Sequence, residues 1–205
     1  MLRINSVLIK SCPLLTGKTG GTAIRSVLRV SFVALLILLI GLRQTVYGVD
    51  YLPEYKLKAA VLLNILKFVD WPTAAFLSED TPLLIGVLGI DPFGPFMEEA
   101  LDGRKIKGRS VQIKRSNDLA DLKDCHVLFI SDSKKRILPT ILNEIHGKPI
   151  LLVSDMDQSV QDGGMISIVR KGDKIQFDVN QTAYKTSDFT ISAQLLKLAR
   201  KVVEE

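Results

Sequence analysis

The chain has 205 residues, of which 47% are hydrophobic and 24% are charged, and its formal net charge is +5. Six of the 27 Lys and Arg residues and none of the 22 acidic residues precede Gly48, so the remainder carries 21 basic against 22 acidic residues. A near-neutral body lacks the basic footprint of a nucleic-acid-binding protein, so DNA and RNA are excluded as expected partners.

The first distinctive segment is an apolar run of 13 residues, Val30–Leu42, which follows several basic residues. It is shorter than the roughly 20 residues that a membrane-spanning helix needs, and it matches the apolar part of a secretory signal. Val46-Tyr47-Gly48 is a small-x-small pattern of the kind that a signal peptidase cleaves. We therefore predict a signal peptide over residues 1–48 and a single domain over residues 49–205. An uncleaved anchor is the alternative, and it would leave the domain on the same side of the membrane.

Pro53 opens a predicted helix, and the pair Trp71-Pro72 ends it. Ten of the thirteen residues in Leu57–Val69 are apolar, which is more than a one-sided surface helix needs. At 100° per residue, Lys56, Asn64 and Lys67 share one polar stripe, while Lys58 points elsewhere. We predict this stripe, with Trp71, to be a partner or dimer surface. The alternative is that the helix packs entirely inside its own domain.

Apolar runs of strand length then alternate with helical segments. The expected strands are 83–88, 111–114, 127–130 and 150–153, and the expected helical segments are 93–101, 119–122 and 134–145. This alternation predicts an α/β fold with a mostly parallel central sheet, helices on both faces and a Rossmann- or flavodoxin-like strand order. Strands at 165–169 and 175–179 are expected to form a C-terminal antiparallel hairpin, because only a short polar turn separates them. Asn180 can cap the segment that follows, and a terminal amphipathic helix is expected over 191–203.

Cys125 is the one cysteine after Gly48, because Cys12 lies in the predicted leader. An intramolecular disulfide is therefore impossible in the mature chain. His126 adjoins Cys125 on an expected strand, so the two side chains face opposite sides of the sheet and cannot easily form a Cys–His pair. Cys125 is expected to be a small buried residue, and a disulfide between two subunits is the alternative.

Polar residues follow the ends of three expected parallel strands, where ligands bind in open sheets of this kind. The candidate ligand pocket consists of Asp91, Ser131, Ser154 and Asp155. The same residue types cap helices and close turns, so an ordinary turn role is the alternative. The basic segment Arg104–Arg109 could meet an anionic partner or be a solvated loop. GxSxG, HExxH and GxxxxGK[ST] elements are absent, and we predict no catalytic residue, no metal and no cofactor.

Several groups of residues occur in a familiar order between Glu54 and about Val203. They are Glu54-Tyr55-Lys56, Lys58-Ala59, Leu63-Asn64, Lys67-Phe68, Trp71-Pro72, Gly86-Val87-Leu88-Gly89, Asp91-Pro92-Phe93, Cys125 to Ser131, Leu152 to Met156, Gly163 to Ile166, Phe177 to Asn180, Ile191-Ser192 and Leu195 to Ala199. In this order they resemble the YfiR-like (YfiR/HmsC-like) family of periplasmic regulatory proteins. The resemblance covers nearly the whole predicted mature chain.

The resemblance implies a secreted α/β domain, often dimeric, without assigned catalysis. The best understood member of that family binds the periplasmic part of an inner-membrane diguanylate cyclase and holds it inactive. Release of the cyclase raises cyclic di-GMP and promotes biofilm formation. That member carries several cysteines whose disulfides link its control to redox state, whereas only Cys125 remains here.

We therefore predict a periplasmic regulator that contacts and represses a membrane-bound signalling partner, such as a diguanylate cyclase or a sensor kinase. It influences cyclic di-GMP and biofilm formation, and it is expected to be a homodimer. The alternative is a periplasmic receptor that binds a small ligand in the strand-end pocket. A hydrolase ranks last, because no sequence motif supports one.

Overall fold

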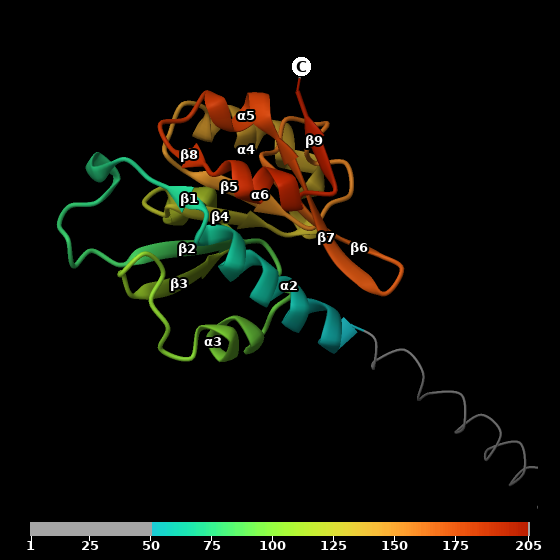
Figure 1. Cartoon of the computed structure of the whole chain (residues 1–205), viewed down its shortest axis with the longest axis horizontal. Coiled ribbons are helices and arrows are strands. Elements are labelled where there is room, and N and C mark those ends of the chain that lie inside the picture. The colour runs from blue at the N-terminus through green and yellow to red at the C-terminus, as the bar shows by residue number, and fades with distance from the viewer. Residues whose placement is uncertain (1–50, 205) are drawn as a thin grey trace, which may run out of the picture. The chain divides into compact units, whose positions relative to one another are not determined.

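The computed structural model describes residues 51–204 (Figure 1). The predicted leader, residues 1–48, lies outside these residues. The described part of the chain contains one large sheet, a second sheet of two short strands, and helices packed against them.

The large sheet has seven strands. They are β2 (Leu83–Leu88), β3 (Val111–Ser116), β4 (Val127–Ile130), β5 (Leu151–Ser154), β6 (Ile166–Lys171), β7 (Lys174–Asn180) and β9 (Lys201–Val203). Their order is β3-β2-β4-β5-β6-β7-β9. The first five are mutually parallel, β7 runs antiparallel to β6, and β9 runs parallel to β7. The two central strands β4 and β5 are buried along their whole length, which explains why their sequences are continuously apolar.

The order of the five parallel strands is that of flavodoxin-like folds, because the first strand of the sheet lies between the second and the third. The elements between the strands are α3 (Phe96–Leu101), η2 (Leu119–Leu122), η3 (Asp132–Ile137) and α4 (Leu138–Ile145). The crossover through α3 and the crossover through α4 move in opposite directions along the sheet. The right-handed rule for such crossovers places these two helices on opposite faces. The predicted α/β class, parallel core and hairpin are confirmed.

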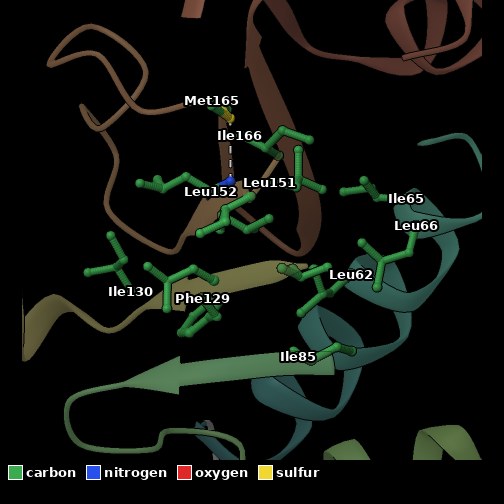
Figure 2. Close-up of a cluster of buried hydrophobic side chains, with 14 of the residues drawn as sticks. Leu62, Ile65, Leu66, Ile85, Phe129, Ile130, Leu151, Leu152, Met165 and Ile166 are labelled. Atoms are coloured by element: carbon green, nitrogen blue, oxygen red, sulfur yellow. Dashed lines mark hydrogen bonds between the residues drawn. The ribbon is translucent and has the colours of Figure 1, made fainter. Parts of the chain in front are cut away.

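Helix α2 (Tyr51–Leu66) lies across one face of the sheet, beside α3 (Figure 1). Leu62, Ile65 and Leu66 point toward the sheet among side chains of β2, β4, β5 and β6 (Figure 2). Each fully buried aliphatic side chain of this kind contributes about 2 kcal/mol of transfer free energy. None of the helices within residues 51–204 is long and apolar enough to cross a membrane.

Helix α2 ends at Leu66, before the pair Trp71-Pro72 that was predicted to end it. Val69 instead belongs to β1 (Val69–Asp70), which pairs antiparallel with β8 (Thr190–Ile191) in the small sheet. The sequence interpretation missed this pairing, because each strand has two residues and the two strands lie about 120 residues apart. A short helical turn, η1 (Thr73–Ala75), follows Pro72.

The expected terminal helix over 191–203 is wrong in its second half. Ser192 caps α6 (Ala193–Leu198) by accepting a hydrogen bond from the Leu195 amide, and the chain then turns into strand β9. Arg200 binds the fully buried Asp178 of β7 through two hydrogen bonds, which aligns β9 at the sheet edge. The β-branched Val202 and Val203 suit a strand better than a helix. The predicted Asn180 cap is confirmed, at the start of the short helix α5 (Gln181–Lys185).

Candidate functional site

The crevice between the ends of β2 and β4 is the place where flavodoxin-like folds bind their ligands. Here the two loops that follow these strands touch each other. The Ile90 amide donates a hydrogen bond to Ser133 Oγ at 3.0 Å. Gly89 has a φ of +99°, and a Cβ at this position would lie 2.5 Å from the same oxygen. The glycine thus allows a loop contact that any side chain would prevent.

Asp91, the first predicted pocket residue, makes two contacts at this end of the sheet. Its Oδ1 accepts a hydrogen bond from the Phe93 amide at 2.8 Å, which closes an Asx-turn. Its Oδ2 accepts a hydrogen bond from Arg115 Nε at 2.6 Å. The same guanidinium binds both carboxylate oxygens of Glu98 and holds the pKa of Glu98 below its usual value.

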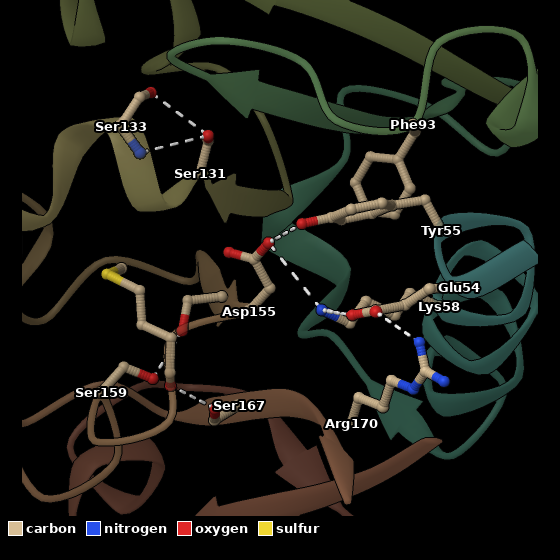
Figure 3. A network of polar contacts seen from close by, with 12 residues as sticks. Glu54, Tyr55, Lys58, Phe93, Ser131, Ser133, Asp155, Ser159, Ser167 and Arg170 are labelled. Atoms are coloured by element: carbon tan, nitrogen blue, oxygen red, sulfur yellow. Dashed lines mark hydrogen bonds and ion pairs between the residues drawn. The ribbon is translucent and has the colours of Figure 1, made fainter. Parts of the chain in front are cut away.

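The two predicted serines are hydrogen-bonded within their own loops. Ser131 caps η3 and accepts a hydrogen bond from Ser133 Oγ at 3.2 Å (Figure 3). Ser154 is fully buried and donates a hydrogen bond to Ser159 Oγ. Ser131 therefore has the capping contact that was the alternative to a ligand role, and Ser154 is already paired with a neighbouring serine.

Asp155 differs from the other three, because it contacts helix α2 (Figure 3). Tyr55 donates a hydrogen bond from its hydroxyl to Asp155 Oδ2 at 2.7 Å, and Lys58 Nζ lies 4.0 Å from the same oxygen. Lys58 also pairs with Glu54 at 2.7 Å, and Arg170 of β6 lies 3.5 Å from the second oxygen of Glu54. The side chains of Lys58 and Asp155 are each 5% exposed. A chain of alternating charges, buried at Lys58 and Asp155 and open to solvent at Arg170, thus joins the first turns of α2 to the ends of β5 and β6.

Burial raises the pKa of the Asp155 carboxyl group, while the Tyr55 hydrogen bond and the nearby Lys58 act in the opposite direction. The other oxygen, Oδ1, is buried and accepts no hydrogen bond from residues 51–204. The sequence interpretation did not foresee the contact between Lys58 and Asp155, which lie 97 residues apart. The signal for it was the position of Lys58, a charged residue off the polar stripe of a mostly apolar helix.

The predicted surface residues of α2 lie on its other side. The Lys56 side chain is 63% exposed and pairs with Glu99 of α3 at 3.2 Å. Asn64 and Lys67 are exposed and hydrogen-bonded to each other. Trp71 is half-buried, and its indole N–H donates a hydrogen bond to the His126 carbonyl. Three of the four residues therefore face solvent, while Trp71 contacts the body of the domain.

His126 is buried in the structure. Its Nδ1 accepts a hydrogen bond from the Leu84 amide, so its Nε2 carries the proton and donates to the Ala75 carbonyl. Burial lowers the pKa of His126. Burial raises the pKa of Cys125, which is 3% exposed, to about 11, and the expectation of a small buried thiol is confirmed. Within residues 51–204, no group of three or more His, Cys, Asp or Glu side chains could hold a metal ion.

The strand order and these contacts define the class of the protein: an α/β domain of flavodoxin-like topology whose strand ends are tied together by its own side chains. The chain belongs to the YfiR/HmsC-like family, whose model matches residues 55–200. The family comprises periplasmic regulators of cyclic di-GMP signalling, is regulatory and non-catalytic in general, and acts through membrane signalling partners.

Two solved structures are similar to this chain. The ABC domain from Streptococcus pneumonia, crystallised in complex with L-Trp, is 12% identical with a TM-score of 0.51, and the match covers 71% of this chain and 60% of that one. A conserved domain protein from Vibrio cholerae is 14% identical with a TM-score of 0.44, and the match covers 73% and 60% of the two chains. This chain thus spans about three fifths of each structure. Only the first match, with the higher TM-score, supports an argument, and at 12% identity it supports the fold alone.

Proposed function

We propose that this chain is a periplasmic regulator that contacts a membrane-bound signalling protein, such as a diguanylate cyclase, through the exposed side of α2, and that it represses this partner. Export by the predicted leader and action as a homodimer belong to the same proposal. Family membership supports the class of function. The observation that carries the assignment of the surface is the polar stripe of Lys56, Asn64 and Lys67, exposed on a helix whose other side is buried.

A contact surface works best when its side chains are held in place before the partner arrives, because less conformational entropy is then lost on binding. Helix α2 meets this condition. Its apolar side packs on the large sheet (Figure 2), and Tyr55 and Lys58 tie its first turns to Asp155. The stripe is therefore presented at a fixed place by a helix that cannot easily shift. Its two lysines favour an acidic surface on the partner.

The test is photo-crosslinking in cells that export the whole chain, with a photoreactive amino acid in place of Asn64. We expect an adduct with an inner-membrane protein and a rise in cyclic di-GMP when the gene is deleted. Lys67→Glu should fail to restore the low level of cyclic di-GMP, whereas the matched control Lys123→Glu, an exposed lysine on η2's C-terminal side, should restore it. Absence of a membrane adduct together with unchanged cyclic di-GMP on deletion would refute the proposal.

One observation favours the second candidate, a small-ligand receptor. Asp155 Oδ1 is buried and has no donor within residues 51–204, so a ligand that donates a hydrogen bond would satisfy it. Thermal-shift measurements with nucleotides, amino acids and divalent ions test this function. A shift that Asp155→Ala abolishes supports it, and a flat response across all three classes rejects it.

A further inference from the structure

The basic segment that follows α3 divides into two groups of cations. Arg109 donates hydrogen bonds to three backbone carbonyls, and its guanidinium lies 3.7 Å from the centre of the Phe76 ring. The carbonyls are those of Ser78, Glu79 and Thr81. Lys107 pairs with Asp70 of β1. These two cations hold the loop between β1 and β2 in place, so the fold already uses their charges.

Arg104 and Lys105 are different. Both are exposed, and neither pairs with an acidic side chain anywhere in residues 51–204. Together with Lys67, which directly follows α2, they line a recess of about 330 Å³ between α2 and α3. Lys67 hydrogen-bonds only the neutral amide of Asn64, so its charge is not balanced there. Three uncompensated positive charges thus gather around one opening.

The rest of the recess is apolar apart from Asn64, and no acidic residue lines it. Its apolar residues are Ala60, Leu63, Ala100, Leu101 and Ile106. Ile106 is held from behind by a tight turn, in which its N–H and carbonyl both bond Arg109, with Lys107 and Gly108 at positive φ. Glu99, on the neighbouring helix, already pairs with Lys56. The recess therefore combines a preformed apolar floor with a positive rim.

We propose that this recess binds a small ligand with an apolar body and an anionic head group, such as a carboxylate. The floor would bury the apolar body, and the three cations would favour the negative head over a neutral one. A volume of about 330 Å³ lies at the lower end of the range for small-molecule sites, which suits a compact ligand. Asn64 and Lys67 belong both to this recess and to the proposed contact surface. Such a ligand would therefore compete with the membrane partner or change the affinity of the chain for it. Binding itself does not depend on the proposed function.

The test is calorimetric titration of the exported, purified protein with three probes: octanoate, 1-octanol and acetate. Octanoate should bind. We expect 1-octanol, which lacks the charge, to bind at least about fivefold more weakly. We expect acetate, which lacks most of the chain, to bind at least about a hundredfold more weakly. Equal affinities for octanoate and 1-octanol, or no binding of octanoate, would overturn the proposal.

Two variants test whether octanoate binds in the recess. Ala60→Trp fills it from an exposed position on α2, and Lys67→Glu/Arg104→Glu reverses two of its charges, so both should abolish or weaken octanoate binding by about tenfold or more. Lys123→Glu is the matched control and should bind octanoate as the parent chain does. Unchanged affinity in both recess variants would contradict the site. If octanoate does not bind but Arg104→Glu abolishes the Asn64 crosslink, the recess contacts protein, and the ligand proposal fails while the proposed function stands.

Discussion

The two sides of α2 carry charges of the same kind in opposite situations. On the buried side, Lys58 is 5% exposed and lies between the carboxylates of Glu54 and Asp155. On the solvent side, Lys67 is exposed and bonds only a neutral neighbour. The sequence alone shows both as lysines in one helix. Their difference teaches that a buried charge is committed to holding the fold, whereas an exposed one is available for binding.

The largest expected effect comes from removing the buried ammonium group. Lys58→Met leaves the carboxylates of Glu54 and Asp155 without their shared cation, and we expect the free energy of unfolding to fall by about 3 kcal/mol. Urea denaturation measures this loss. Lys56→Met is the matched control two residues away, because its exposed pair with Glu99 should contribute less than about 0.5 kcal/mol. Equal losses in the two variants would erase the distinction between the two sides of α2.

Tyr55→Phe tests the contact between α2 and Asp155 by removing its neutral hydrogen-bond donor. The substitution removes one hydroxyl that donates to a buried carboxylate, and the ring can keep its edge-on contact with Phe93. We expect a loss of about 1.5 kcal/mol in the free energy of unfolding, which is typical of a hydrogen bond to a charged group. Tyr184→Phe is a suitable control, since it removes the hydroxyl of another buried tyrosine far along the chain. A Tyr55→Phe variant as stable as the parent chain would show that Asp155 does not depend on this donor.

The pH dependence of stability tests whether the Asp155 carboxyl group binds a proton more tightly in the folded protein than in the unfolded chain. Burial raises the pKa of this carboxyl in the folded protein, so the folded state binds the proton more tightly than the unfolded state does. The resulting stabilisation is fully present below the unfolded pKa of about 3.9 and is lost as the pH rises through the folded value. Relative to Asp155→Asn, the parent chain should therefore lose stability between acidic and neutral pH. Urea denaturation across that range measures the difference, and a slope of the opposite sign would mean that Lys58 and Tyr55 outweigh burial.

The centre of the parallel sheet could be predicted from the sequence because its strands β2, β4 and β5 are almost entirely buried and mostly apolar. The strands β2, β4 and β5 lie within one residue of their expected bounds. The edge elements could not be predicted, because short strands such as β1, β8 and β9 depend on partners far away in the sequence. Lys201–Val203 follows a helical segment, and its pairing with β7, aligned by the Arg200–Asp178 contact, is a long-range feature that the local pattern does not show.

The candidate site shows the same limit. The positions of Asp91, Ser131, Ser154 and Asp155 at the strand ends follow from the parallel topology, which the sequence predicts. Which of these four residues contacts a helix depends on where α2 packs on the sheet. The position of α2 is decided by tertiary packing. Asp155 contacts Tyr55 and Lys58 because the first turns of α2 pass over the end of β5. The apolar pattern of α2 predicts that it is buried, but it does not say against which strands.

The smallest expected effect on stability belongs to the exposed side of α2. Lys67→Glu replaces a cation that pairs with no carboxylate within residues 51–204, so the free energy of unfolding should change by less than about 0.5 kcal/mol. The same substitution should nonetheless reduce the Asn64 crosslink to the membrane partner, because it places a negative charge on a surface proposed to meet an acidic one. Measuring stability and crosslinking on one preparation separates the two roles. If the Lys67→Glu chain loses both stability and the crosslink, this side of α2 also stabilises the fold. Lys67 and Lys58 would then differ only in how much each contributes to stability.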